Sequence, residues 1–280
     1  MKQNPPKNPI TSCFFLGIGA QKSGTSWLNT YLKSHSEVFV PPIKEMHFFG
    51  NRENPNLKFF ERQVAFQEVV TAFTGQRNTK RIKSLETRIS MQGDITKYKR
   101  YFQNRLTTEK TYGEISPSYA YMDKSELAEI QNHFPDAKII FLMRNPVARA
   151  WSQMRFSHIK DTREELYEKA LIRMAESGYI QRCNYRLTIE NLISVFPRNQ
   201  IHFEFFERLF TQNAVDRICD FLGVTHQKAD LYRKQNVANN IPLPQGLRHD
   251  MAEILRPQYT FANHFFNSDL PQKWHNEFIA

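Results

Sequence analysis

A turn of small residues directly after an apolar run is the first feature of the sequence that could do chemistry. Residues 19–26 read GAQKSGTS and follow CFFLGI at 13–18. The backbone N–H groups of residues 22–26 would be left unpaired at the start of the next helix, whose dipole favours negative charge. The turn, with Lys22 in its middle, therefore predicts a site for a phosphate-like anion.

The spacing of this turn differs from that of the best-known nucleotide loops. A Walker loop places its lysine directly after the second glycine, whereas Lys22 precedes Gly24. The dinucleotide fingerprint also fails, because Lys22 stands where that fingerprint has its third glycine after Gly17 and Gly19. An anion loop remains the better interpretation than a kinase loop, and a plain strand-to-helix turn is the alternative.

A second candidate anion site follows another buried strand. In P-loop NTPases such a strand ends in an aspartate that holds magnesium, but residues 138–144 read KIIFLMR and end in Arg144. An arginine at the carboxyl end of a strand suits a second phosphate without a metal. Ser152 lies two helical turns further on and could add a hydroxyl. The alternatives are a structural ion pair for Arg144 and a solvent-facing position for Ser152.

The elements that must position these residues alternate between strands and helices. Strands are expected at 13–18, 111–115, 137–143 and 200–206, and helices at 25–35, 124–134, 146–158, 164–176, 180–195 and 207–222. Thr25 and Ser26 are candidate caps of the first helix, and Gly223 would end the last. The alternation predicts an α/β, P-loop-like three-layer fold with a central parallel β-sheet flanked by helices.

Composition is that of a folded protein, with 40% hydrophobic and 24% charged residues in 280. We expect a flexible N-terminal segment at 1–12 and a single domain over 13–280.

The three cysteines, Cys13, Cys183 and Cys219, lie far apart without zinc or disulfide spacing, which favours a reducing compartment. No apolar stretch is long enough to span a bilayer. The expected location is therefore cytoplasmic, or peripheral on the inner face of a membrane.

The net charge of +10 points to anionic partners. Residues 71–110 hold ten Lys and Arg against three acids, and we interpret them as a basic insertion or a substrate-side region. A solvated basic face is the alternative. The sequence has no helix-turn-helix, zinc or RNP motif, and this disfavours a nucleic-acid partner.

Together these motifs resemble the PAPS-dependent sulfotransferases, especially the bacterial and heparan-sulfate-type carbohydrate sulfotransferase branch. QKSGTSWL at 21–28 is similar to the 5′-phosphosulfate loop of that family, and RNPVARAWS at 144–152 to its 3′-phosphate motif. PPIKEMHFF at 41–49 is similar to the segment with the catalytic glutamate, and GEISPSY at 113–119 to a substrate-side strand. Matches near the C-terminus extend the resemblance over nearly the whole chain from about residue 13.

The resemblance implies PAPS as the sulfuryl donor, PAP as its product, and no required metal. It implies these nucleotide contacts: Lys22, Ser23, Gly24, Thr25 and Ser26 with the 5′-phosphosulfate, Trp27 with the adenine, Arg144 and Ser152 with the 3′-phosphate, and Tyr185 near the nucleotide. For Tyr185, a core-facing position on a helix is the alternative.

Sulfuryl transfer requires a base for the acceptor hydroxyl and a group that stabilises the leaving phosphate. The resemblance makes Glu45 the candidate base, with His47 as the alternative base or an orienting neighbour, and Lys22 the stabilising cation. If residues 45–49 are extended, Glu45, His47 and Phe49 share one face. Glu114 is expected to pair with a cation of the loop instead of acting as the base.

Two departures from the heparan-type pattern shape the expected acceptor. Ile115 stands where those members have lysine, and residues 225–250 lack their cysteine-bounded lysine-rich loop. The expected acceptor is therefore a bacterial-type glycan, glycolipid or other hydroxyl compound. The competing hypotheses are a P-loop nucleotide kinase, which would require magnesium, and a non-catalytic basic protein that binds nucleic acid.

Overall fold

The computed structural model describes residues 12–50, 63–67, 70–71, 74–75, 79–91, 93–158, 160–175, 177–232 and 241–279. The expected flexible segment at 1–12 lies outside the described residues except for Ser12, whose hydroxyl donates to the carbonyl of Glu109 at 2.8 Å.

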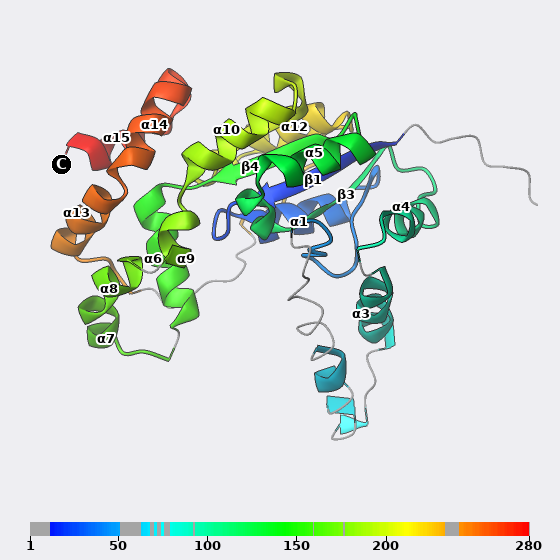
Figure 1. Ribbon diagram of the computed structural model, residues 1–280, viewed down its shortest axis with the longest axis horizontal. Coiled ribbons are helices and arrows are strands. Elements are labelled where there is room, and N and C mark those ends of the chain that lie inside the picture. The colour runs from blue at the N-terminus through cyan, green and yellow to red at the C-terminus, as the bar shows by residue number, and fades with distance from the viewer. Residues whose placement is uncertain are drawn as a thin grey trace, which may run out of the picture.

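A parallel five-stranded sheet forms the centre of the described chain (Figure 1). Its strands are β1 (Cys13–Gly19), β2 (Val38–Phe39), β3 (Thr111–Ile115), β4 (Lys138–Met143) and β5 (Ile201–Phe205). Their spatial order is β2-β3-β1-β4-β5, and every neighbouring pair is parallel. The chain leaves β1 toward β2 but leaves β4 toward β5, so the strand order switches direction between β1 and β4. Crevices that bind ligands form at the carboxyl ends of such a pair.

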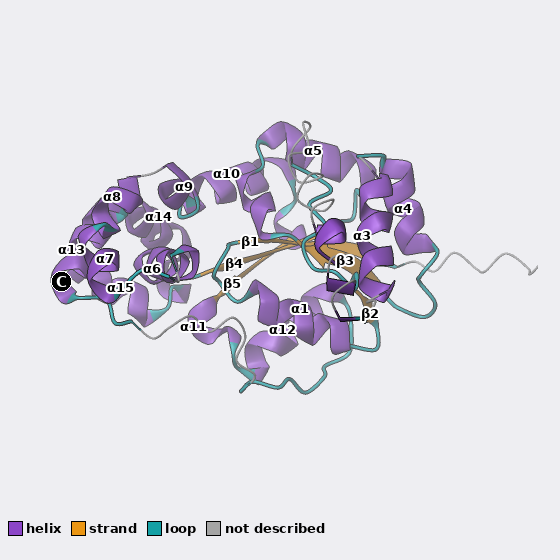
Figure 2. Cartoon of the chain, turned by 90° about the horizontal axis from the view of Figure 1, so that it is seen from below, coloured by secondary structure: helices purple, strands orange, loops and turns teal. Residues whose placement is uncertain are grey.

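Helices cover both faces of the sheet (Figure 2). On one face lie α1 (Thr25–Ser34) and α12 (Gln212–Leu222), and on the other α5 (Lys124–His133) and α10 (Tyr185–Val195). Each face has its own apolar core, because Leu28 and Ile218 pack in one cluster while Ile130 and Leu192 pack in the other. The predicted three-layer α/β fold is confirmed.

The remaining helices lie mostly at the two ends of the sheet. They are α3 (Thr79–Met91), α4 (Ile95–Gln103), η1 (Pro117–Tyr121), α6 (Pro146–Ser157), α7 (Arg163–Glu168), α8 (Ala170–Ala175), α9 (Ser177–Gln181), η2 (Arg198–Gln200), α11 (Phe206–Leu209), α13 (Gln245–Ile254), α14 (Arg256–Phe266), η3 (Asn267–Asp269) and α15 (Gln272–Ile279). Figure 1 shows α3 and α4 at one end and α13, α14 and α15 at the other, beside α6 to α8.

The predictions of three long helices are wrong, because the chain forms two shorter helices in each of these regions. The expected helix at 180–195 breaks where Asn184 accepts a hydrogen bond from the backbone of Leu187 and caps α10. The expected helix at 207–222 breaks where Thr211 caps α12, and the one at 164–176 breaks at Lys169. Asparagine and threonine compete with the helix for backbone N–H groups, which makes them N-caps in mid-pattern.

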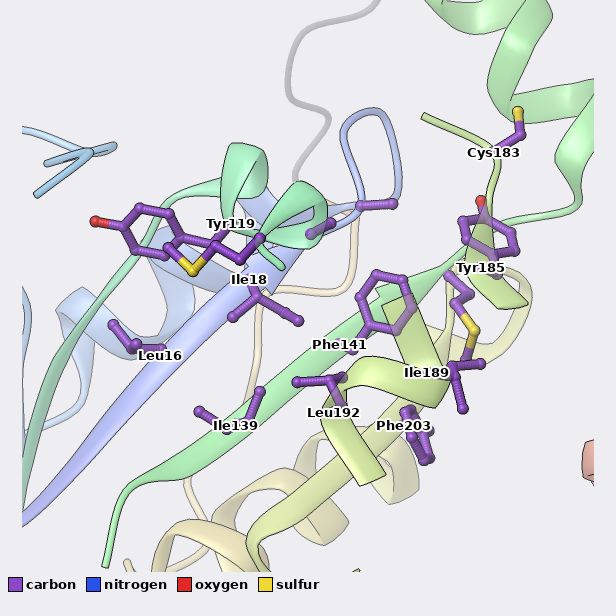
Figure 3. Packing of buried hydrophobic residues seen from close by; sticks show 14 of the residues in the cluster. Leu16, Ile18, Tyr119, Ile139, Phe141, Cys183, Tyr185, Ile189, Leu192 and Phe203 are labelled. Atoms are coloured by element: carbon purple, nitrogen blue, oxygen red, sulfur yellow. The ribbon is translucent and has the colours of Figure 1, made fainter. Parts of the chain in front are cut away.

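Apolar side chains of β1, β4 and α10 interdigitate on one face of the sheet (Figure 3). Phe141 of β4 and Tyr185 of α10 meet edge to face at 5.8 Å between ring centroids. Burial of each large side chain contributes about 1.5–3 kcal/mol. This packing holds the carboxyl ends of β1 and β4 in a fixed relation to each other.

Candidate active site

The loop after β1 turns through two left-handed residues, Lys22 at φ 67° and Gly24 at φ 91°. A Cβ atom at Gly24 would lie 2.5 Å from the side chain of Leu209, so glycine also serves a close approach. The expectation that Thr25 and Ser26 cap α1 is wrong, because Gly24 occupies the N-cap and has no side chain with which to cap. The first-turn N–H groups of α1 therefore remain suited to an anion.

Arg144 lies beside this loop, as the sequence predicted. Its Nη1 donates to the carbonyl of Lys22 at 3.1 Å, and its guanidinium lies 4.2 Å from the ring centroid of Phe206. The hydroxyl of Tyr185 donates to the backbone carbonyl of Arg144 at 2.8 Å. Tyr185 is thus a core residue that holds the end of β4, while its contact with a nucleotide stays a prediction.

The cations around the loop repel one another, which disfavours their charged forms. Burial, followed by the charges of Arg144, Arg155 and Lys44 and then Arg149, lowers the pKa of Lys22 to about 8. Burial also lowers the pKa of Arg144 and of Arg155. An anion bound among these groups would relieve both the repulsion and the cost of burial. The electrostatics therefore favour a multiply charged anionic ligand.

A cavity of about 620 Å³ opens next to Arg144. It is lined by Arg144, Asn145, Ala148, Phe206, Glu207, Phe210, Arg248 and Lys273. Aromatic rings and cations together suit a nucleotide base and a phosphate. The cavity thus extends the anion site toward the C-terminal helices α13 and α15.

Three predicted nucleotide contacts are buried. Ser152 is only 7% exposed, so its alternative as a solvent-facing serine is wrong. Ser23 is fully buried and its hydroxyl has no hydrogen-bond partner among the described residues. Trp27 packs in the core, where Nε1 donates to the carbonyl of Asp230 at 3.1 Å, and its ring meets Phe210 edge-on at 5.2 Å. Phe210 rather than Trp27 lines the cavity, and the contacts of all three with a nucleotide stay predictions.

The segment at 45–49 is not extended, so the expected common face of Glu45, His47 and Phe49 is wrong. Glu45 has φ 65° and His47 has φ 45°, which turns the chain twice. Met46 and Phe49 point into the core instead. The two candidate bases nevertheless meet, because Nε2 of His47 lies 3.3 Å from Oε2 of Glu45.

The surroundings of Glu45 keep it ionised. Burial alone would raise the pKa of its carboxyl, but the contacts with His47 and Lys44 outweigh burial and lower the pKa to about 2. The other ring nitrogen of His47, Nδ1, lies 2.7 Å from the hydroxyl of Ser118. Glu45 is therefore well placed to accept a hydrogen bond, and it is a weak base as long as Lys44 and His47 both stay in contact with it.

A buried carboxylate, Glu114 of β3, holds in place the loop of residues 45–49, here called the base loop after its two candidate bases. It accepts hydrogen bonds from the backbone of Met46 at 2.9 Å and from the hydroxyls of Tyr98, Ser116 and Tyr119 at 3.0, 2.6 and 2.7 Å. The backbone donor belongs to the base loop and the hydroxyl donors to α4 and to residues 116–119, not to the anion loop (residues 19–26), so the expected pairing of Glu114 with a loop cation is wrong.

The hydroxyl partners of Glu114 continue the support of the base loop. The Ser116 hydroxyl accepts from the backbone of His47 at 3.2 Å. The Tyr119 hydroxyl accepts from Phe48 and Phe49 at 2.7 and 3.2 Å. Four successive backbone N–H groups, 46 to 49, are therefore bound by the GEISPSY segment.

Glu114→Gln is expected to lower the free energy of unfolding by about 1–2 kcal/mol, because the amide cannot accept from all four donors and leaves a buried one unpaired. If Glu45 is the base of the expected sulfuryl transfer, turnover should fall while affinity for PAP persists, since the change acts on the base loop. Urea unfolding and nucleotide titration check both points. Glu190→Gln, at an exposed position of α10, is the matched control, and equal stability of the two variants would contradict the supporting role.

Lys44, which the sequence analysis did not single out, joins the two loops. Its Nζ donates to Oγ1 of Thr25 and to Oγ of Ser26, both at 3.3 Å, and to Oε1 of Glu45 at 2.9 Å. Its position next to Glu45 in the PPIKEMHFF segment was the one available signal. The anion loop and the candidate base therefore belong to one site.

The described part of the chain has neither a cluster of metal-ligating side chains nor a helix that could span a membrane. Within it, no cluster of three or more His, Cys, Asp and Glu side chains could hold a metal ion. The helices of that same part are all too short or too polar to cross a bilayer. Cys13, Cys183 and Cys219 are free thiols.

Solved structures share this fold. A sulfotransferase from Alicyclobacillus acidocaldarius superposes with a TM-score of 0.63 at 23% identity, over 93% of this chain and 98% of that one. The sulfotransferase domain of the Synechococcus PCC 7002 olefin synthase gives a TM-score of 0.55 at 21% identity, over 97% and 100% of the two chains. At these identities the likeness concerns the fold alone.

Two comparisons of sequence also match sulfotransferases. The membrane-associated sulfotransferase kil1 of Dictyostelium discoideum is 25% identical over 143 residues, which is 51% of this chain but only 22% of that protein's length. The profile of a family described as the sulfotransferase family matches residues 15–228, well over half of the chain. That stretch contains the anion loop, the base loop and Arg144, and the chain therefore belongs to the sulfotransferase family.

Proposed function

We propose that this protein transfers a sulfuryl group from PAPS to an acceptor hydroxyl, on a carbohydrate or glycolipid. The observation that carries the proposal is the junction at Lys44, which places the cationic loop of Lys22 and the carboxylate of Glu45 on either side of one ammonium group. A donor anion in the loop and an acceptor hydroxyl at Glu45 would then be neighbours.

The residues of the site divide the chemistry among them. PAPS supplies the sulfuryl group. Glu45, or His47 beside it, accepts the proton of the acceptor hydroxyl as the hydroxyl oxygen attacks the sulfur. Lys22 and the first-turn N–H groups of α1 stabilise the charge that develops on the phosphate oxygen as its bond to sulfur breaks. Arg144, Ser152 and the adjoining cavity hold the far end of the nucleotide.

The acceptor would approach from the side of α3 and α4. The inner face of α4 packs in the core through Tyr98 and Phe102, and its outer face carries Lys97 and Arg100. An anionic glycan or a glycolipid headgroup suits that basic surface. The name of the kil1 relative refers to a membrane, and for this chain we propose a cytoplasmic or peripheral membrane location.

A transfer assay with labelled PAPS in the presence of a chelator tests the function, over cell-envelope glycans, glycolipids and small hydroxyl compounds. Label in one acceptor class is the expected result. Magnesium-dependent phosphoryl transfer from ATP would instead support the kinase hypothesis. Salt-sensitive binding of random DNA without affinity for PAP would support nucleic-acid binding.

PAP binding is expected to weaken as the pH rises above about 8. The pKa of Lys22 in the free protein is lowered to about 8, and a bound anion would raise it, so the protonated form binds better. Between these two pKa values the affinity should fall about tenfold per pH unit. Calorimetric titration from pH 7 to pH 10 measures the effect. Lys22→Arg keeps its charge and should flatten the profile; a flat profile in the unmodified protein would contradict the assignment.

A further inference from the structure

Lys44 uses all of its hydrogen-bonding capacity at the junction of the two loops. An ammonium group has three donors, and Nζ of Lys44 contacts three oxygens, those of Thr25, Ser26 and Glu45. The side chain is 20% exposed and thus open on one side. The strongest of the three contacts is the charged one with Glu45, at 2.9 Å.

The other two partners of Lys44 are the hydroxyls of the first two residues of α1. The N–H groups of that turn form the anion site, so an anion bound there lies within reach of Nζ. The charge of Lys44 already acts on the same place, since it is one of the charges that lower the pKa of Lys22. Because all three donors of Nζ are in use, an anion that binds Nζ must displace one of its partners, Thr25, Ser26 or Glu45.

We propose that Lys44 is a further catalytic residue, which pairs with Glu45 in the free protein and binds the sulfuryl group of the donor once the donor is present. Donor binding then releases Glu45 to act as the base. This inference rests on the proposed function. In the transfer step the acceptor O–H bond breaks and its proton goes to Glu45, an O–S bond forms, and the S–O bond to the 5′-phosphate breaks with its electron pair on the phosphate oxygen.

The groups around Glu45 make such a release possible. His47 contacts the opposite carboxylate oxygen, Oε2, so Glu45 keeps its orientation when Lys44 leaves Oε1. Arg88 of α3 adds a more distant positive charge. Lys44 itself is attracted by the carboxylate of Glu45 and repelled by the positive charge of Lys22. Loss of the Lys44 contact would raise the pKa of Glu45, and a base closer to neutrality accepts a proton more readily.

The test compares the affinities of PAPS and PAP without acceptor, because only PAPS carries the sulfuryl group. In Lys44→Met, PAPS affinity should fall about tenfold or more, the scale of a charge-assisted contact, while PAP affinity changes less than about twofold. In Glu45→Gln, where Lys44 has lost its charged partner, PAPS should bind more tightly relative to PAP. In the double variant that gain should vanish, which is the coupling expected of a shared ammonium group.

Lys33→Met is the matched control, because Lys33 supports the same loop through the carbonyl of Pro42 at 3.0 Å. It should alter both affinities equally, if at all. Equal losses of PAPS and PAP affinity in Lys44→Met, or an unchanged ratio in Glu45→Gln, would overturn the inference and leave Lys44 a structural residue. If the unmodified protein binds neither PAPS nor PAP, the proposed donor is wrong as well. If the protein transfers sulfate but the ratio of PAPS to PAP affinity is unchanged in the variants, only the proposed role of Lys44 is wrong.

Discussion

Arg144→Ala is expected to weaken PAP binding by about 1.5–3 kcal/mol, the scale of a hydrogen bond to a charged group. Arg144 lines the cavity beside the anion loop, and its position is fixed from three sides: by the Lys22 carbonyl, by the Phe206 ring and by the Tyr185 hydroxyl on its backbone. Since these supports hold the guanidinium in place before a ligand arrives, little ordering cost opposes the contact.

Calorimetric titration with PAP, in buffer with a chelator, measures this loss, and the melting temperature shows whether the variant is folded. Arg186→Ala is the control, because Arg186 is an exposed arginine of α10 that pairs with Glu190 and should matter little. Unchanged PAP affinity in folded Arg144→Ala would remove the assignment of Arg144 to the 3′-phosphate.

The sheet and the place of Arg144 were predictable from the sequence because their signals are local. Apolar runs such as KIIFLM mark strands that are buried on both faces, and small-residue turns mark the strand ends. The alternation with helices then implies a parallel sheet, whose carboxyl ends meet at one edge. That logic brought Lys22 and Arg144 together correctly, although 122 positions separate them in the chain.

The shape of the base loop was not predictable from its own residues. Glu45 and His47 take left-handed φ values that non-glycine residues rarely adopt. The partners that fix this shape, Glu114, Ser116 and Tyr119, lie about 70 positions further along. Long-range hydrogen bonds therefore override the local preference for an extended segment, and strained backbone of this kind gathers at functional sites.

Core packing decided the positions that residue types alone left open. Trp27 and Tyr185 were expected near the nucleotide, but a large aromatic ring at helical spacing also fills a core, and both are at most 4% exposed. The cavity wall is instead made by Phe206 and Phe210 of the segment after β5. Phe206 begins α11 and Phe210 is its C-cap, and the Phe206 ring lies against the guanidinium of Arg144.

Glu45→Gln is expected to lower turnover by about 10² to 10⁴, the usual contribution of a general base, while PAP binding persists. Glutamine keeps the size of the side chain and can still accept a hydrogen bond from Lys44. The variant therefore separates the charge and basicity of Glu45 from its packing. Turnover, PAP affinity and melting temperature are measured together on Glu45→Gln and on His47→Ala.

The geometry predicts different outcomes for these two variants. His47 lies between Glu45 and Ser118, at 3.3 Å from the carboxylate and 2.7 Å from the hydroxyl. If His47 only orients Glu45, His47→Ala should cost less than Glu45→Gln. Near-normal turnover in Glu45→Gln with a collapse in His47→Ala would transfer the role of base to the histidine, with Glu45 as its orienting partner. Near-normal turnover in both would place the base outside the 45–49 loop, and the positive φ values there would then have to be explained by packing alone.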